Sequence, residues 1–532
     1  MGWSGSFDAA LAAGGKPRFS VAVVPAPLLG GLFPSSTPTF ESHTGHGGSA
    51  LLSVSGFDYD TGRLDIQQWN VQGGGARINV ALKATDGATI ANLRRGQIVA
   101  LTAHFGAVSE RIWCGTLWNV VSSHDSLQEV TLECRGITNA LVTRQVGSAS
   151  DLRLYEDLVS DTSRTHGLFT GSWSPGTSNL VMSSTTGTFE QEAGGRMLVL
   201  CDPGGTVGTI SGSAFYLSIA SYTSGTLTLN TPLDVDLFGT TRASLTSGSP
   251  IYLVPAVLQS APIAAAFKII TSTGASQAGT ALNGAYDLLP IEWGAGFPST
   301  LVDYGDVYQQ NALTLDSGGA AILMDVFRRQ EPYSNPRTLI AEVLNPMGVC
   351  LVQRQGSLTV RVCQDPTSVT NATGFTISDA SLAPRGVRVH NAFAPSFLES
   401  PDVTWEDAAG NDTAGTNTLV SSLPTRAPQT FTASHLWGSN DVPIEGTRNR
   451  MQRWLTTMPE TATLALHGLS AAELCPGDLP NCTITSDKLR SLRPGGLGVS
   501  DQRVLVLSVR VSWFGTDLET EVEVMAAPED VQ

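Results

Sequence analysis

Two stretches near opposite ends of the chain share one alternation of apolar and polar residues. The first runs from residue 110 to residue 121, and a second alternating run at 127–134 follows a short polar segment. The last part of the chain repeats this plan at 502–513 and 518–525, with a turn at 515–517. Alternation over this length predicts a long, half-buried β-hairpin in each place.

Each predicted hairpin follows a glycine and a polar residue that begin another strand. These pairs are Gly96-Gln97 and Gly477-Asp478. Because the same order of elements occurs twice, the sequence indicates two antiparallel β-domains of similar architecture in one chain.

The pattern divides the chain into five parts. Residues 1–45 are rich in Pro, Gly, Ser and Thr and predict an extended arm that orders against a partner, with one strand at 21–24. Residues 46–147 form the first β-domain and 384–532 the second. Between them lie an inserted region, 165–256, and a mixed region, 257–383.

The two middle parts differ in their patterns of apolar residues and in the elements that these predict. In 165–256, short apolar runs recur between Gly-rich turns, which predicts a small β-barrel or sandwich. Residues 257–383 predict helices at 319–328 and 337–344, then a hairpin that turns at Gln355-Gly356-Ser357. In the last part we expect a helix at 448–456 and a strand at 461–467.

Composition supports a mainly β fold with a smaller α+β part. The chain has 532 residues, of which 41% are apolar and 55 are glycine, enough for several cores and many turns. A formal net charge of −16 repels phosphates and argues against a sequence-reading nucleic-acid binder. The same charge suits a wall past which DNA slides without binding. We expect no membrane-spanning segment and no signal peptide.

Candidate chemistry is sparse. The chain contains no Gly-x-Ser-x-Gly, His-Glu-x-x-His or P-loop motif. His124-Asp125 fits a solvated turn, and Asp58 to Asp65 resembles an incomplete calcium loop that is better explained as a polar turn. We therefore predict no catalytic, cofactor-binding or metal-binding residues and no enzyme activity.

The seven cysteines are odd in number and widely spaced, without a Cys-x-x-Cys pair. Cys475 and Cys482 are read either as buried thiols or as a metal half-site or disulfide, and the first reading is favoured. Free thiols, the favoured reading, fit assembly in a reducing cytosol.

The order of elements resembles the baseplate hub, or tail-tip hub, of long-tailed bacteriophages, which is related to the spike base of type VI secretion systems. The resemblance covers about residues 46–532 without the insertion. It rests on the first β-domain, the linker with Leu288-Leu289-Pro290-Ile291-Glu292-Trp293-Gly294, the helix and hairpin at 338–362, and Leu474-Cys475-Pro476-Gly477-Asp478 before the last strands. The insertion is not part of the minimal hub.

The resemblance implies a homotrimer in the virion, at the tail tip, assembled in the host cytoplasm. Each chain would supply two tail-tube-like β-barrel domains, so that three chains match a sixfold tail tube above and a threefold spike or fibre below. Implied partners are the tail tube or distal tail protein, the tape-measure protein and the spike or fibre protein, with DNA passing through the lumen. Strands that we expect at subunit interfaces carry Arg111, Trp113, Trp118, Arg503, Arg510 and Trp513.

Two other functions fit parts of the sequence. A receptor-binding, glycan-recognising tail-tip adhesin is suggested by the Gly/Ser/Thr-rich β texture, the ten tryptophans and the insertion. A glycan-degrading enzyme has only the acidic composition and pairs such as Asp234 and Asp236 in its favour.

Overall fold

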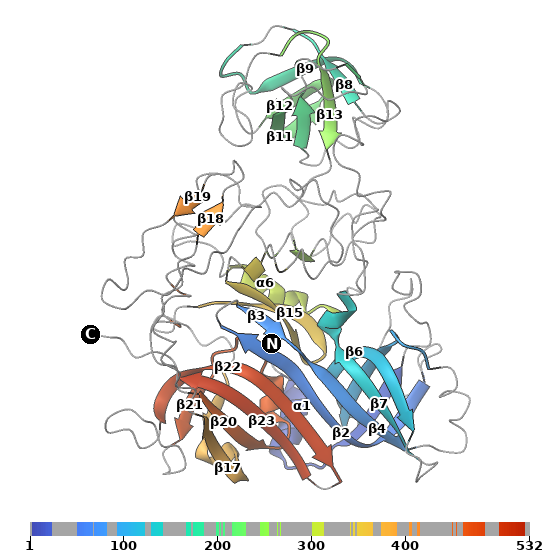
Figure 1. The fold of residues 1–532 in the computed structure, drawn as a ribbon, viewed down its shortest axis with the longest axis vertical. Helices are drawn as coiled ribbons and strands as arrows, with labels where there is room; N and C mark the ends of the chain where they lie inside the picture. Colours follow the sequence, from blue (N-terminus) through green and yellow to red (C-terminus); the bar gives the residue numbers. More distant parts are fainter. Residues whose placement is uncertain are drawn as a thin grey trace.

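The chain is mainly β. The computed structural model describes residues 3–23, 50–66, 69–81, 93–122, 129–141, 166–171, 174–185, 198–201, 203, 206–207, 215–229, 245–254, 263, 266–267, 301–312, 341, 344–345, 348–364, 374–390, 404–406, 412–414, 450, 454, 461–484, 499–515 and 517–526. In these residues, long antiparallel strands account for most of the regular structure (Figure 1).

The first unit is a closed barrel of six main strands. They are β1 (Arg18–Val23), β2 (Ala50–Asp65), β4 (Gly75–Ala81), β5 (Ile98–Phe105), β6 (Val108–Ser122) and β7 (Glu129–Gly136). Their neighbour order is β1-β5-β6-β7-β4-β2, and β1 also pairs with β2, which closes the ring. Short β3 (Asn70–Gln72) extends β2. Alternating burial along β7 turns Val130, Leu132 and Cys134 into the core, as the period of two requires.

The N-terminal residues belong to this barrel. The arm expected there is wrong for residues 3–23, which form α1 (Gly5–Ala12) and β1. Trp3 and Phe7 are buried, and the Phe7 ring meets Phe105 at 5.1 Å between centroids. These aromatic side chains carry enough apolar area to dock the segment on its own chain. The rest of the expected arm lies outside the described residues.

The second unit also has six strands. They are β16 (Thr376–Ser378), β17 (Leu382–His390), β20 (Thr461–His467), β21 (Asn481–Ile484), β22 (Val499–Phe514) and β23 (Asp517–Ala526). Their neighbour order is β16-β21-β22-β23-β20-β17. The strand expected at 461–467 is β20, and the predicted hairpin is β22–β23.

The two units are joined in one continuous sheet. β2 of the first unit pairs antiparallel with β22 of the second, from Gly56 opposite Phe514 to Arg63 opposite Ser508. Figure 1 shows β2 and β22 side by side, and the joined sheet has 13 strands. The polar turn expected from Asp58 onward is wrong, because these residues continue β2 through a bulge before Arg63. A residue stretch that is polar on one face and apolar on the other suits a strand as well as a turn.

The mixed region places a hairpin and a helix above the joined sheet (Figure 1). β14 (Val349–Arg354) and β15 (Ser357–Val362) turn at Gln355 and Gly356, both with positive φ, where the sequence predicts the turn. Helix α6 (Tyr304–Ala312) has no counterpart in the sequence prediction. The helix expected at 319–328 lies outside the described residues, and those at 337–344 and 448–456 are described only in part.

The inserted region forms a closed barrel of its own, at the top of Figure 1. Its strands are β8 (His166–Phe169), β9 (Asn179–Thr185), β10 (Leu198–Cys201), β11 (Phe215–Thr223), β12 (Thr226–Leu229) and β13 (Pro250–Val254). The first and last strands are neighbours, with His166 opposite Tyr252. The inserted barrel therefore begins and ends at one place.

Smaller elements complete the described structure. They are the two-stranded sheet of β18 (Thr404–Glu406) and β19 (Asp412–Ala414), and the 3-10 helices η2 (Ile137–Leu141), η6 (Asp379–Ser381) and η8 (Ser470–Glu473).

Candidate functional site

The two units have the same strand order. Numbered along the chain within each unit, the strands lie side by side in the order first, fourth, fifth, sixth, third, second in both. The hairpin of β6 and β7 in the first unit therefore corresponds to that of β22 and β23 in the second. One difference is the first strand, since β1 runs antiparallel to β5 whereas β16 runs parallel to β21.

The corresponding hairpins also share one irregularity. In the first hairpin the register shifts after Leu117, and in the second it shifts after Val506. The extra residue of this β-bulge is Trp118 in β6 and Leu507 in β22. A bulge is a local feature that a hairpin does not need, so its presence at one matched position argues for true structural equivalence.

The turn before the fourth strand is the same in both units. Gly96 and Gly477 have φ values of 89° and 92°, a region that favours glycine. The Gly96 N–H donates to Leu117 O at 2.8 Å, and the Gly477 N–H donates to Val506 O at 2.9 Å. The same turn therefore docks on the same residue of the fifth strand in each unit.

The polar residue after each glycine closes the turn. The Gln97 side chain accepts a hydrogen bond from Arg94 N at 2.7 Å, and the Asp478 carboxylate accepts one from Cys475 N at 2.8 Å. Both side chains are buried, so these bonds satisfy groups that have left water. The glycine and polar pairs noticed in the sequence therefore mark equivalent positions.

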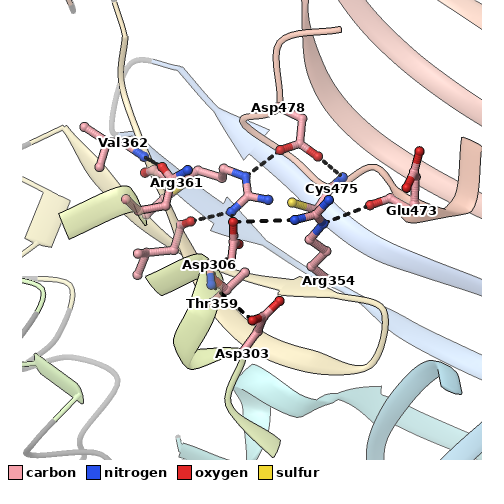
Figure 2. A network of polar contacts seen from close by, with 12 residues as sticks. Asp303, Asp306, Arg354, Thr359, Arg361, Val362, Glu473, Cys475 and Asp478 are labelled. Atoms are coloured by element: carbon pink, nitrogen blue, oxygen red, sulfur yellow. Dashed lines mark hydrogen bonds and ion pairs between the residues drawn. The ribbon is translucent and has the colours of Figure 1, made fainter. Parts of the chain in front are cut away.

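Asp478 also forms an ion pair with the hairpin of β14 and β15. The Arg361 guanidinium of β15 donates from Nε to Asp478 Oδ1 and from Nη1 to Asp306 Oδ2 of α6, both at 2.5 Å. Arg354 of β14 lies 3.5 Å from Asp306 Oδ1 and donates to the Glu473 carbonyl oxygen at 3.2 Å. Figure 2 shows Arg361 between the two carboxylates. This network joins the mixed region to the second unit.

The network is buried and electrically balanced. The two arginines and the two aspartates all have side chains about 5% exposed or less. Burial by itself raises the pKa of the Asp306 carboxyl, but Arg361 and Arg354 outweigh it and hold that pKa below its usual value. Asp306 is therefore an anion that balances the arginine charge.

The tip of the same hairpin docks on the first unit. Gln353 Nε2 donates to the Cys114 carbonyl oxygen at 2.7 Å, and the Ile137 N–H donates to Gln353 Oε1 at 3.1 Å. Arg111 Nη2 donates to Ser357 Oγ at 2.6 Å. The hairpin thus contacts both units and fixes one relative to the other.

The six residues named on the expected interface strands all make contacts within this chain. Trp113 is wholly buried in the first barrel, which rules it out as a surface residue. Arg111 holds the hairpin tip. Arg503 stands opposite Asn481 where β22 pairs with β21. The expectation concerned the strands that carry these residues, and the place of those strands at a subunit interface remains a proposal.

Arg510 and Trp513 lie on the junction between the two units. Arg510 binds the Asp58 carboxylate of β2 with two hydrogen bonds, and the Trp513 ring meets Phe19 and Phe57 at 4.7 and 5.9 Å. These contacts do form an interface, but between the two units of one chain.

Trp118 has different surroundings. Its ring lies between the guanidinium groups of Arg95 and Arg135, 3.1 and 3.2 Å from its centroid. Trp118 is half-buried, and both arginines are exposed. The two cations fix the ring by cation–π attraction at the surface of the first unit.

The described residues offer no metal centre. No group of three or more His, Cys, Asp or Glu side chains among them is placed to hold a metal ion. All seven cysteines are buried free thiols, and burial raises the pKa of Cys482 to about 12. Cys475 and Cys482 are thus buried thiols, as the favoured reading expected. The helices in the described part of the chain are too short or too polar to span a membrane.

The buried network is the feature that sequence reasoning missed. Its signal was Arg361 between Val360 and Val362, a charge within a strand whose neighbours are all buried. A lone arginine in such a run indicates a buried carboxylate partner. The partners themselves lie 55 and 117 residues away, so the sequence did not identify them.

Comparisons with known proteins give matches only among solved structures. No protein-family model and no curated protein matches the chain. The 43 kDa tail protein of prophage MuSo2 from Shewanella oneidensis is 11% identical, over 95% of this chain and 98% of that one, with a TM-score of 0.39. A tail protein from Neisseria meningitidis is 10% identical over 97% of both chains, with a TM-score of 0.40. A component of the E. coli type VI secretion system is 9% identical over 90% of this chain and 74% of that one, with a TM-score of 0.28.

Proposed function

We propose that this chain is a structural virion protein of a bacteriophage tail. In this proposal it is the baseplate hub, a homotrimeric ring at the tail tip that adapts the sixfold tail tube to a threefold spike or fibre. The order of elements along the chain suggested this function, and the geometry of the two units is what now supports it best.

The observation that carries the proposal is the equivalence of the two units. They share strand order, the bulge at Trp118 and Leu507, and the turn at Gly96 and Gly477. A threefold ring presents six similar surfaces only when each chain holds two near-equivalent units. One chain with two copies of a unit is what such an adapter needs.

The hairpin of β14 and β15 supplies the rigidity that the task requires. It contacts the first unit through Gln353 and the second through Arg361. A buried ion network with satisfied partners has few alternative arrangements, because any displacement leaves a charge unpaired. The two units are thereby held in a fixed relation, as a ring of defined geometry demands.

The net charge of −16 fits the passage of DNA. A surface with this charge repels phosphate groups, so a transported nucleic acid does not adhere to it. In the proposal, the tail tube or distal tail protein, the tape-measure protein and the spike or fibre protein are the partners of the ring.

Electron microscopy of the purified full-length chain tests the proposal. We expect top views with six similar densities around a central channel and overall threefold symmetry. Particles that hold one copy at every concentration, or a closed assembly without a channel, would count against the hub function.

A further inference from the structure

On the basis of the proposed ring, we infer that β17 of one copy pairs with the outer edge of β6 of a second copy. The stretch of β6 that receives it is residues 118–122, and Trp118 anchors the contact. The partner is thus another molecule of this same chain.

The template for this contact is the junction inside the chain. There β2, the second strand of the first unit, pairs with β22, the fifth strand of the second unit. If the units are equivalent, the second strand of the second unit pairs in the same way with the fifth strand of the first unit in another copy of the chain. Those strands are β17 and β6, and within one chain they do not pair.

β17 occupies in its unit the place that β2 occupies in the first. Asp60 of β2 stands opposite Gly75 at the start of β4, and His390 of β17 stands opposite Thr461 at the start of β20. The side of β2 that faces away from β4 is the side that binds β22. Among the described residues, β17 pairs with β20 alone, so no described strand covers the matching side. Such an edge is a template for another strand.

β6 has a matching edge. Its pairing with β5 reaches Thr116, and two further backbone hydrogen bonds join Leu117 to Gln97 and Gly96. Within the described residues, 118–122 pair with β7 only. The equivalent stretch of β22 is the part that β2 covers. Each unit thus offers two edges for pairing, its second strand and the end of its fifth strand. Inside the chain, the second strand of the first unit pairs with the fifth strand of the second unit, which leaves β17 and the end of β6.

The side chains on this edge suit an interface. Val121 of β6 is 43% exposed, one of few large apolar side chains in the described residues with that exposure. Trp118 corresponds to Leu507, which is 1% exposed because it lies in the apolar cluster formed by both units and the hairpin. By equivalence, Trp118 lies where a neighbouring unit would cover it. Its ring is already fixed by Arg95 and Arg135, so ordering it costs little on binding.

The template also sets the register. Inside the chain, Asp60 pairs with Arg510 and Tyr59 with Val511. The equivalent residues place His390 opposite Val121 and Val389 opposite Ser122 between copies. The contact joins unlike surfaces, so each copy uses β17 on one neighbour and β6 on the other. Three copies then close a ring of six units in which every junction has the same strand pairing.

A matched pair of exposed valines tests the contact. Val121→Asp places a charge on the inferred interface, whereas Val181→Asp places the same charge on β9 of the inserted barrel, where Val181 is 44% exposed. In native mass spectrometry of the full-length chain, we expect Val121→Asp to be monomeric and Val181→Asp to stay trimeric. Circular dichroism of both variants checks that the fold is kept. A trimeric, folded Val121→Asp variant would overturn the inference.

Cysteine pairing tests the register without disturbing the fold. Chains with Val121→Cys are mixed, under oxidising conditions, with chains that carry His390→Cys. Residues opposite each other across two strands have the Cα separation that a disulfide needs. We expect covalent dimers of one chain of each kind, and none when His390→Cys is mixed with Val181→Cys.

The outcomes separate this inference from the proposed function. If the wild-type chain is a trimer but the Val121 and His390 cysteines do not link, the strand assignment is wrong while the ring stands. If the wild-type chain is a monomer at all concentrations and the cysteines still do not link, both fail.

Discussion

Gln97 and Asp478 close the same turn in the two units, and of the two Asp478 carries the charge that meets Arg361. Each accepts a hydrogen bond from a backbone N–H three residues earlier, at 2.7 and 2.8 Å. The second unit thus has the same turn and, in addition, a 2.5 Å ion pair between Asp478 and Arg361 of the hairpin. The turn is therefore common to both units, whereas the ion pair joins the second unit to the hairpin.

Asp478→Asn removes the charge but keeps an oxygen for the turn. Since it leaves the buried Arg361 with one carboxylate in place of two, we expect a loss of about 3–5 kcal/mol in unfolding free energy. Asp58→Asn is the matched control, because it also faces an arginine but in an exposed pair, and there we expect a loss below about 1 kcal/mol. Denaturant unfolding followed by tryptophan fluorescence measures both. Equal losses would contradict the role given to the buried network.

Acid should weaken the same network. Burial raises the pKa of Asp306, but Arg361 and Arg354 lower it further, and the net pKa in the folded chain lies below the ordinary value of 3.8. In the unfolded chain the carboxyl takes up its proton near 3.8, whereas in the folded chain it does so only at lower pH. Its contribution is therefore complete above pH 3.8 and is lost as the pH falls through the folded value.

Asp306→Asn removes this titration. We expect the unfolding free energy of the wild-type chain to fall more steeply below pH 3.8 than that of the variant. Thermal unfolding across that range measures the difference. Parallel curves for the two proteins would show that Asp306 does not titrate as the geometry implies.

Much of this organisation could be predicted from the sequence, and the limits have physical causes. The pairs Gly96-Gln97 and Gly477-Asp478 and the two alternating hairpins are local patterns, and the structure places them at equivalent positions. The joining of the units by β2 and β22 was not predicted. It pairs residues about 450 positions apart, and the local sequence of neither strand identifies the strand that it pairs with.

The side of each strand that faces the core was also difficult to assign. Trp113 and Trp118 lie in one predicted strand, and alternation alone would put them on opposite faces. The bulge at Trp118 changes the alternation beyond it, so Val121, which alternation puts on the same face as Trp113, is exposed whereas Trp113 is buried. In the first residues, the apolar contribution of Trp3 and Phe7 was hidden in a Gly- and Ser-rich segment, so the docked helix α1 was read as an arm.

Gly356 should be sensitive to any side chain. Its φ is +68°, and a Cβ there would lie 2.9 Å from Arg111 side-chain atoms and from the Trp113 backbone. Gly515 has a similar φ of +72° in the turn of β22 and β23, with open space around it. We expect Gly356→Ala to lower the melting temperature clearly more than Gly515→Ala, because the first also separates the hairpin tip from the first unit. A larger effect at Gly515 would count against the docking role of that tip.

The inserted barrel should be dispensable for assembly. It is closed on itself, and its first and last strands are neighbours, so a short Gly-Ser linker can replace residues 166–254 without stretching the chain. We expect the shortened chain to form the same oligomer as the full-length chain, as judged by light scattering. Loss of the oligomer with retained folding would assign the barrel to the subunit interface.

The native mass of the full-length chain is the most direct test of the account. Each of the two equivalent units has one strand edge paired inside the chain and one edge available for another copy. This arrangement predicts a closed assembly of three copies. Native mass spectrometry should therefore give three times the chain mass of 55.9 kDa, unchanged on dilution until the subunits separate. A species of 55.9 kDa at every concentration would contradict the ring and the strand pairing that builds it.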